Sequence, residues 1–102
     1  MVGVAVLSAA CGGSQTGIAK GGDVGQGKKL FIANCGGCHT LADAGTTGTL
    51  GPNLDDTKPS KSLVVERVTD GKPPMPAFGK DGTLTKQQID AVADYVSSAA
   101  GK

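Results

Sequence analysis

The segment Cys35-Gly36-Gly37-Cys38-His39 constrains this 102-residue chain more than any other feature. Two thiols three positions apart can reach the two vinyl groups of one porphyrin, and a histidine directly after the second thiol can bind its iron. The pattern predicts a covalently attached haem c, with Cys35 and Cys38 as the thioether links and His39 as one iron ligand. Electron transfer is therefore the leading functional interpretation.

The cysteine pair has two other interpretations. A thioredoxin-like site would need a strand leading into the motif and βαβ units around it, and no part of the sequence alternates like a sheet. Half of a zinc site would need further ligands, but His39 is the only histidine and Cys11 is the only other cysteine. Both interpretations lack the residues that they require, which favours the haem.

Composition agrees with a small domain built around a cofactor. The chain has three aromatic residues and no tryptophan, so its side chains alone offer little large apolar surface for a core. A haem fills that gap, and 17 glycines indicate long loops around few helices. The net charge is +1, from ten basic and nine acidic residues mixed along the chain, which argues against nucleic acid as a partner.

Residues 1–22 differ in character from the rest of the chain. Met1 to Ala10 is apolar and too short to span a bilayer, and Leu7-Ser8-Ala9-Ala10-Cys11 resembles the end of a bacterial lipoprotein signal. A lipid on Cys11 would hold the protein at a membrane surface through the Gly-rich linker that follows. An ordinary secretory signal cut near Ala10, or a tail with a free thiol, is the alternative. Either signal implies export to the periplasm or the outer face of the cytoplasmic membrane, with a folded domain over 23–102.

Three helices are predicted within that domain. The first runs from Asp23 as N-cap to about Asn34, with an internal Gly27 that indicates close approach of another backbone. The second runs from Ser60 as N-cap to about 69, with Leu63, Val64 and Val68 toward a core. The third, over 86–99, follows the capping box Thr85-Lys86-Gln87-Gln88 and buries Ile89, Val92, Ala93 and Val96, with Tyr95 beside them. The stretches 40–57 and 71–82 are expected to be loops.

Met75 is the candidate for the second axial ligand of the iron. A second histidine ligand is impossible because the chain has only His39, and Met75 is the one methionine besides Met1. Pro73, Pro74 and Pro76 keep Met75 out of helical conformation on a stiff, extended segment. A methionine there is a poor core residue of a helix, and a thioether ligand opposite histidine raises the reduction potential.

These motifs together resemble the class I cytochromes c, in particular the small bacterial and photosynthetic ones. The resemblance covers about 23–102, and its motifs stand in family order. They are Gly27-x-x-x-Phe31, Cys35-Gly36-Gly37-Cys38-His39, Gly51-Pro52-Asn53-Leu54, Pro74-Met75-Pro76-Ala77-Phe78, and Ile89 to Val96 with Tyr95.

The resemblance implies an all-α cytochrome c fold of three to four helices with long loops around one haem. It implies that the first and last helices cross, that Phe31 packs toward Tyr95, and that the Pro52 carbonyl accepts the Nδ1 proton of His39. The expected function is one-electron transfer between membrane or periplasmic redox proteins by a monomer, without enzymatic activity. The alternatives are a haem-bearing subunit of a larger oxidase or dehydrogenase complex, and an open-haem peroxidase-like or gas-binding protein.

Overall fold

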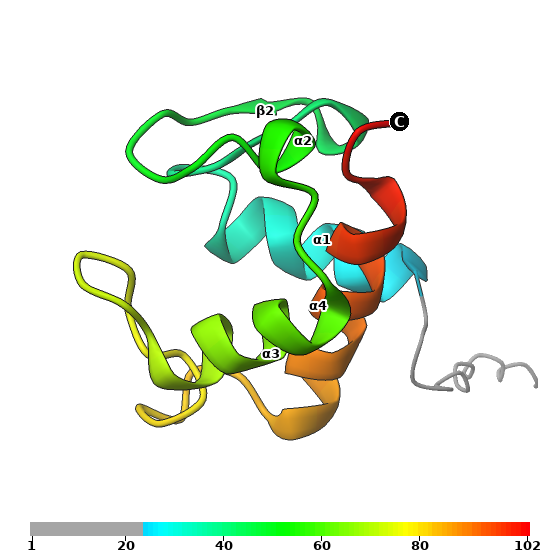
Figure 1. The fold of residues 1–102 in the computed structure, drawn as a ribbon. Coiled ribbons are helices and arrows are strands. Elements are labelled where there is room, and N and C mark those ends of the chain that lie inside the picture. The colour runs from blue at the N-terminus through cyan, green and yellow to red at the C-terminus, as the bar shows by residue number, and fades with distance from the viewer. Residues whose placement is uncertain (1–23) are drawn as a thin grey trace, which may run out of the picture.

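The computed structural model describes residues 24–102, and within them four helices are joined by long connections, with a small two-stranded sheet at one edge beside α2 (Leu54–Thr57) (Figure 1). The elements follow one another as α1 (Val24–Asn34), β1 (Thr40–Leu41), the 3-10 helix η3 (Ala42–Ala44), β2 (Thr46–Thr47), α2 (Leu54–Thr57), α3 (Lys61–Asp70) and α4 (Lys86–Ala99). The predicted fold class is confirmed: the domain is mainly helical with long connections. The predicted segment 1–22 and the cap Asp23 lie outside the described residues.

Helix α4 has the bounds and the N-terminal cap that the sequence predicts. The Thr85 hydroxyl accepts a hydrogen bond from the Gln88 N–H, and the Gln88 side chain accepts one from the Thr85 N–H, which together form a capping box. One face of the helix is buried, comprising Ile89, Ala91, Val92, Ala93, Tyr95, Val96 and Ala99. The apolar residues spaced three and four apart thus form one buried face, and α4 contributes more buried residues to the core than α3 does.

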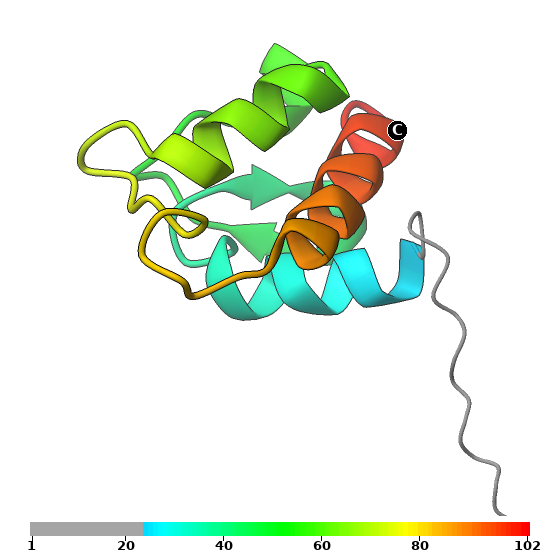
Figure 2. The same cartoon turned by 90° about the horizontal axis from the view of Figure 1, so that it is seen from below.

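Helix α1 crosses α4 in direct contact (Figure 2). A Cβ added to Gly27 would overlap the Ala91 carbonyl oxygen and lie 2.8 Å from the Tyr95 Cβ, so only glycine allows this approach. One turn later, the Phe31 and Tyr95 rings pack with centroids 6.1 Å apart and planes tilted by 59°. The predicted close approach at Gly27 and the packing of Phe31 toward Tyr95 are both confirmed.

Helix α3 begins at the predicted cap and lies against α4. The Ser60 hydroxyl accepts a hydrogen bond from the Leu63 N–H, and Val64 and Val68 are buried. Leu63 was expected to face the core, but its side chain is 39% exposed. Leu63 lines a cavity together with the buried Val64 and Val68.

The stretch 40–57, predicted as loop, contains short regular structure. Strands β1 and β2 pair antiparallel, with Leu41 opposite Thr46. Helix α2 is capped by Asn53, whose side chain accepts a hydrogen bond from the Asp55 N–H. These elements span only two to four residues, too few for periodicity in the sequence to reveal them.

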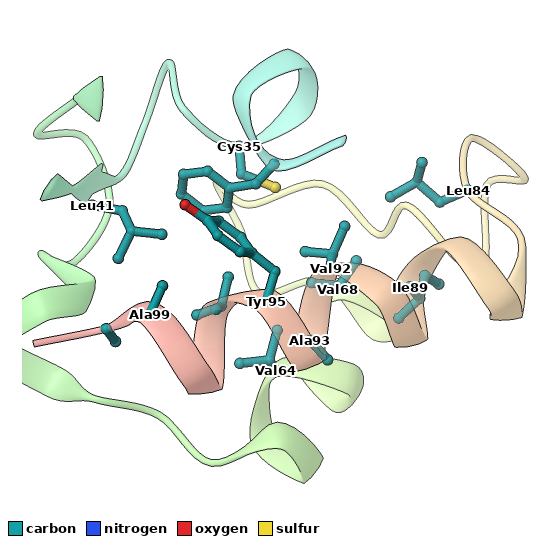
Figure 3. Close-up of a cluster of buried hydrophobic side chains, with 13 residues drawn as sticks. Cys35, Leu41, Val64, Val68, Leu84, Ile89, Val92, Ala93, Tyr95 and Ala99 are labelled. Atoms are coloured by element: carbon teal, nitrogen blue, oxygen red, sulfur yellow. The ribbon is translucent and has the colours of Figure 1, made fainter. Parts of the chain in front are cut away.

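Tyr95 lies at the centre of the core, with Leu41 on one side and Val92 on the other (Figure 3). Its side chain is 1% exposed, and its hydroxyl donates a 2.6 Å hydrogen bond to the Asp43 carboxylate. Burial, together with this carboxylate, raises the pKa of Tyr95 above its ordinary range, so the phenol stays protonated and donates. Within residues 24–102, no helix has both the length and the apolar character needed to cross a membrane.

Asp55 joins three segments of the chain. One carboxylate oxygen accepts the Ala42 N–H of η3 at 2.8 Å, and the other accepts the Gly101 N–H near the C-terminus at 2.8 Å. These hydrogen bonds from Gly101 and Ala42 lower the pKa of Asp55, because they favour the ionised carboxylate. The short helix α2 is thereby tied to the segment that follows β1 and to the end of α4.

We expect Asp55→Asn to lower the free energy of unfolding at neutral pH, because an amide has one oxygen to accept these two N–H groups. A carboxyl whose folded-state pKa is lowered stabilises the fold above its unfolded-state pKa of about 3.9, and loses that contribution as pH falls through the lower folded-state value. The difference between variant and wild type should therefore shrink in that acid range. Denaturation curves from pH 7 to pH 2 measure it.

Asp56→Asn is the matched control, since Asp56 is exposed on the same short helix and the charge change is identical. An equal loss of stability in both variants would show that general charge balance, rather than the Asp55 hydrogen bonds, is responsible.

Candidate functional site

A cavity of about 400 Å³ lies between the segment that follows α1, helix α3 and the segment that follows α3. This volume is in the range of pockets that hold cofactors and other small molecules, about 300–1,000 Å³. In Figures 1 and 2 the end of α1 and the loop after α3, coloured yellow, open toward the same side of the molecule. The cavity brings together all five predicted site residues: Cys35, Cys38, His39, Pro52 and Met75.

The two cysteines lie on the turn that continues from α1. The Cys35 N–H donates to the Phe31 carbonyl at 2.7 Å, and the His39 N–H donates to the Cys35 carbonyl at 3.0 Å, so the motif keeps a helix-like turn. Cys35 is buried and Cys38 is partly exposed, and both thiols are free of disulfides. Burial, with a smaller effect of neighbouring Cys38, raises the pKa of Cys35 to about 12, so its thiol is protonated at neutral pH.

The orientation of the His39 ring is fixed from two sides. Its Nδ1 lies 2.8 Å from the Pro52 carbonyl oxygen, and because a carbonyl can only accept, Nδ1 is the protonated nitrogen. This leaves the Nε2 lone pair free for a metal. Gly51 lies directly against the ring: a Cβ there would be 2.6 Å from Cε1 and 2.9 Å from Nδ1 of His39.

The segment 48–52 also packs on the motif through its backbone. The Gly51 N–H donates to the Cys38 carbonyl at 2.7 Å, and a Cβ on Gly48 would lie 2.6 Å from the Gly37 carbonyl oxygen. The sequence indicated only a turn at Gly51-Pro52, and the roles of Gly48 and Gly51 as close contacts were not predicted. Glycine abundance around 45–51 was the available signal.

Met75 lines the cavity from a tight turn. The Met75 N–H donates to the Lys72 carbonyl at 2.8 Å, and the Lys72 N–H donates to the Met75 carbonyl at 3.1 Å. Gly71, with φ of +75°, precedes this turn, and a Cβ there would lie 2.9 Å from the Met75 carbonyl oxygen. The thioether is therefore carried on a hydrogen-bonded turn, where the prolines had predicted an extended segment.

The remaining walls of the cavity are mainly apolar. Leu50 is 71% exposed and Leu63 39% exposed, although both are large apolar side chains that line this cavity. Such exposure is typical of a site that a large apolar ligand covers. Two basic residues, Arg67 and Lys72, also line the cavity, although no motif in the sequence marks them as site residues.

These features fit a haem c. The walls are apolar, as a porphyrin requires, and two thiols for covalent attachment lie on one turn. An imidazole with a free Nε2 and a thioether line the same space, and this nitrogen and sulfur pair is a ligand set used for haem iron. Arg67 and Lys72 offer positive charge for the two carboxylates that a haem carries.

The sequence is similar to a known protein family and to several known cytochrome proteins. Residues 22–96 match the family model described as "Cytochrome C oxidase, cbb3-type, subunit III". A cytochrome c6 of Gloeothece citriformis is 41% identical over 85 residues, covering 79% of this chain and 76% of that protein. The cbb3-type cytochrome c oxidase subunit FixP of a Bradyrhizobium strain is 39% identical over 89 residues, covering 74% of this chain but 30% of that protein.

The fold also matches a solved structure. The crystal structure of the c-type cytochrome SorU from Sinorhizobium meliloti superimposes with a TM-score of 0.71 and 46% sequence identity. The match covers 78% of this chain and 92% of the SorU chain, so it extends far beyond the cysteine motif.

We expect Gly51→Ala to displace the His39 ring, because the new Cβ would lie well inside van der Waals contact with Cε1. Overpacking of this kind costs about 1–3 kcal/mol of stability. Denaturation curves measure that cost, and the NMR resonances of the His39 ring report its orientation.

Gly37→Ala is the matched control, since a Cβ on Gly37 meets no described atom within 4 Å. A normal His39 environment in Gly51→Ala would contradict the role given to Gly51.

Proposed function

Because this chain belongs to the c-type cytochrome family, we propose that it is an exported one-electron carrier whose haem is bound by Cys35, Cys38, His39 and Met75. The family itself makes the chain a mono-haem electron carrier with covalently attached haem c. Beyond this, we propose the residues that bind the haem, the location of the protein and the class of its redox partners.

The observation that carries the proposal is the convergence of four ligand groups on one apolar cavity. Cys35 and Cys38 would attach the group through thioethers, and His39 would bind its iron through Nε2. The Pro52 carbonyl, 2.8 Å from Nδ1, keeps the ring in the tautomer that leaves Nε2 free. This bond also makes the imidazole a stronger electron donor.

Met75 would supply the second side-chain ligand of the iron, from the same cavity. Its backbone is held by the two hydrogen bonds with Lys72, so the sulfur is presented with little freedom to lose on binding. When bound, haem c supplies an iron that changes oxidation state by one electron. If His39 and Met75 both bind the iron, no coordination position would be left for a substrate, which favours a carrier over an enzyme.

The apolar residues around the cavity would keep water away from a bound iron, which favours the less charged ferrous form. Arg67 and Lys72 partly neutralise the two carboxylates of the haem. Both effects act together with the Met75 sulfur to raise the reduction potential.

The working location that we propose is outside the cytoplasm. The domain extends over 23–102, and residues 1–22 serve as a signal segment and linker, with a lipid on Cys11 as the anchor. The partners are redox proteins that donate and accept one electron, and the protein meets them as a monomer.

A second candidate is a haem-bearing subunit of a larger oxidase or dehydrogenase complex. The family model and the similarity to FixP favour it, since both concern cbb3-type oxidase subunits. The electron-transfer chemistry would be the same but serve one fixed partner, so stable co-purification with a membrane complex distinguishes this candidate from a free carrier.

The decisive test compares absorption spectra of haem-loaded wild type and Met75→Ala. Wild type should have the weak far-red band of methionine sulfur on ferric iron and narrow low-spin ferrous bands, both insensitive to carbon monoxide. Met75→Ala should lose the far-red band, bind carbon monoxide rapidly and have a lower reduction potential, because the thioether that favours ferrous iron is gone.

Leu63→Ala is the control, because it also removes an apolar side chain from the cavity wall but no sulfur. It should keep the far-red band. A wild-type protein that binds carbon monoxide at once would overturn the proposal in favour of an open-haem peroxidase-like or gas-binding protein.

We expect Cys11→Ser to move the protein from the membrane fraction to the soluble fraction, because serine lacks the thiol that would carry the acyl chains, and the chain then has no lipid anchor. Cell fractionation followed by haem staining measures this. Unchanged fractionation would remove the lipid anchor from the proposal and leave a cleaved secretory signal as the explanation of residues 1–10.

A further inference from the structure

Thr46, in strand β2, contacts the cysteine motif through both branches of its side chain. Its hydroxyl donates a 2.9 Å hydrogen bond to the His39 carbonyl and accepts one of 3.1 Å from the Leu41 N–H. Both bonds are partly buried, so water replaces them poorly. Thr46 therefore fixes the backbone on the C-terminal side of His39.

The methyl group of Thr46 lies on the loop between the two thiols. A Cβ added to Gly36 would be 2.6 Å from Thr46 Cγ2, so the methyl group packs directly on the Gly36 backbone. Among similar side chains, serine lacks this methyl and valine lacks the hydroxyl. Threonine alone makes both contacts, one with the thiol loop and one with the histidine carbonyl.

The hairpin that carries Thr46 is itself held in place. The Thr40 hydroxyl donates to the Gly48 carbonyl at 2.9 Å, and Leu41, paired with Thr46, is completely buried. The Ala42 N–H is bound by the Asp55 carboxylate. Because the hairpin is anchored at these points, the position of Thr46 does not depend on His39 alone, and Thr46 can fix the position of the His39 backbone.

We propose that Thr46 is a positioning residue for His39: by holding the His39 carbonyl, its hydroxyl keeps the imidazole in line with the Pro52 carbonyl and so sets the reduction potential. This inference rests on the proposed role of His39 as an iron ligand. The direction of the Cα–Cβ bond follows from the backbone that Thr46 fixes, while Pro52 and Gly51 fix only the rotation of the ring. Without the hydroxyl, the bond from Nδ1 to Pro52 is expected to lengthen.

A weaker bond to Nδ1 makes the imidazole a poorer electron donor. A poorer donor stabilises ferric iron less, so the reduction potential rises. The potential is thus adjusted through the hydrogen bond from His39 Nδ1 to the Pro52 carbonyl, and hydrogen bonds to an iron ligand are a recognised means of adjusting haem potentials.

The experiment uses the haem-loaded protein and the variants Thr46→Val, Thr46→Ser and Thr47→Val. Thr47 is the exposed neighbour of Thr46 on the same strand, so Thr47→Val makes the same chemical change away from His39. Three properties are measured: the reduction potential, the paramagnetically shifted NMR resonances of the ferric His39 ring, and the denaturation midpoint. If Thr46→Val does not mature with haem, Thr46→Ala replaces it, because it removes the hydroxyl without adding bulk.

We expect Thr46→Val to raise the reduction potential and shift the His39 resonances. In Thr46→Ser, which keeps a hydroxyl, both quantities should lie close to their wild-type values. Thr47→Val should leave both unchanged. A lower denaturation midpoint in Thr46→Val with wild-type potential and resonances would overturn the proposal and make Thr46 a stabiliser of the hairpin only. A raised potential that Thr46→Ser does not reverse, or that Thr47→Val shares, would also overturn it. If wild type itself lacks a histidine-ligated low-spin spectrum, the failure belongs to the proposed function instead.

Discussion

Gly27 lies against the backbone of α4, and the position of the site depends on that contact. A side chain at this position would overlap the Ala91 carbonyl oxygen, so the two helices meet at the distance that glycine permits. Phe31 then packs on Tyr95 one turn later, and the cysteine turn begins four residues beyond Phe31. The crossing of α1 and α4 thus determines where Cys35 lies in the cavity. Helix α3, which packs on α4, forms another wall of that cavity.

Hydrogen bonds, rather than the apolar packing that joins α1 to α4, hold His39 and the chain that follows it. His39 is held at its amide by Cys35, at its ring by Pro52 and at its carbonyl by Thr46. Each partner comes from a different short segment, and the Asp55 carboxylate ties the residues after β1 to the C-terminal Gly101. A part of the domain with little regular structure is therefore well defined where it meets the histidine.

The parts of the fold that could be predicted are those that the sequence encodes locally. The capping box at Thr85 and the apolar spacing of α4 lie within a few residues of each other, as do the cap at Ser60 and its helix. The site residues could be predicted because the cysteine motif is contiguous and Met75 has no competitor. The hairpin, α2 and the contacts of Thr46 and Gly51 could not, because their partners are distant in sequence and the elements are too short to show a period. Leu63 was misplaced for a related reason: periodicity identifies an apolar face, but not whether protein or cofactor covers it.

The burial of Tyr95 gives this protein a single optical reporter. The chain has one tyrosine and no tryptophan, so nearly all its near-ultraviolet emission comes from a residue that is 1% exposed at the crossing of α1 and α4. That residue touches Phe31, which lines the cavity, and a porphyrin bound there absorbs the light that the phenol would emit. Emission from the haem-loaded protein should accordingly be weak and grow when the two helices separate, so the opening of this one contact can be followed without any added label.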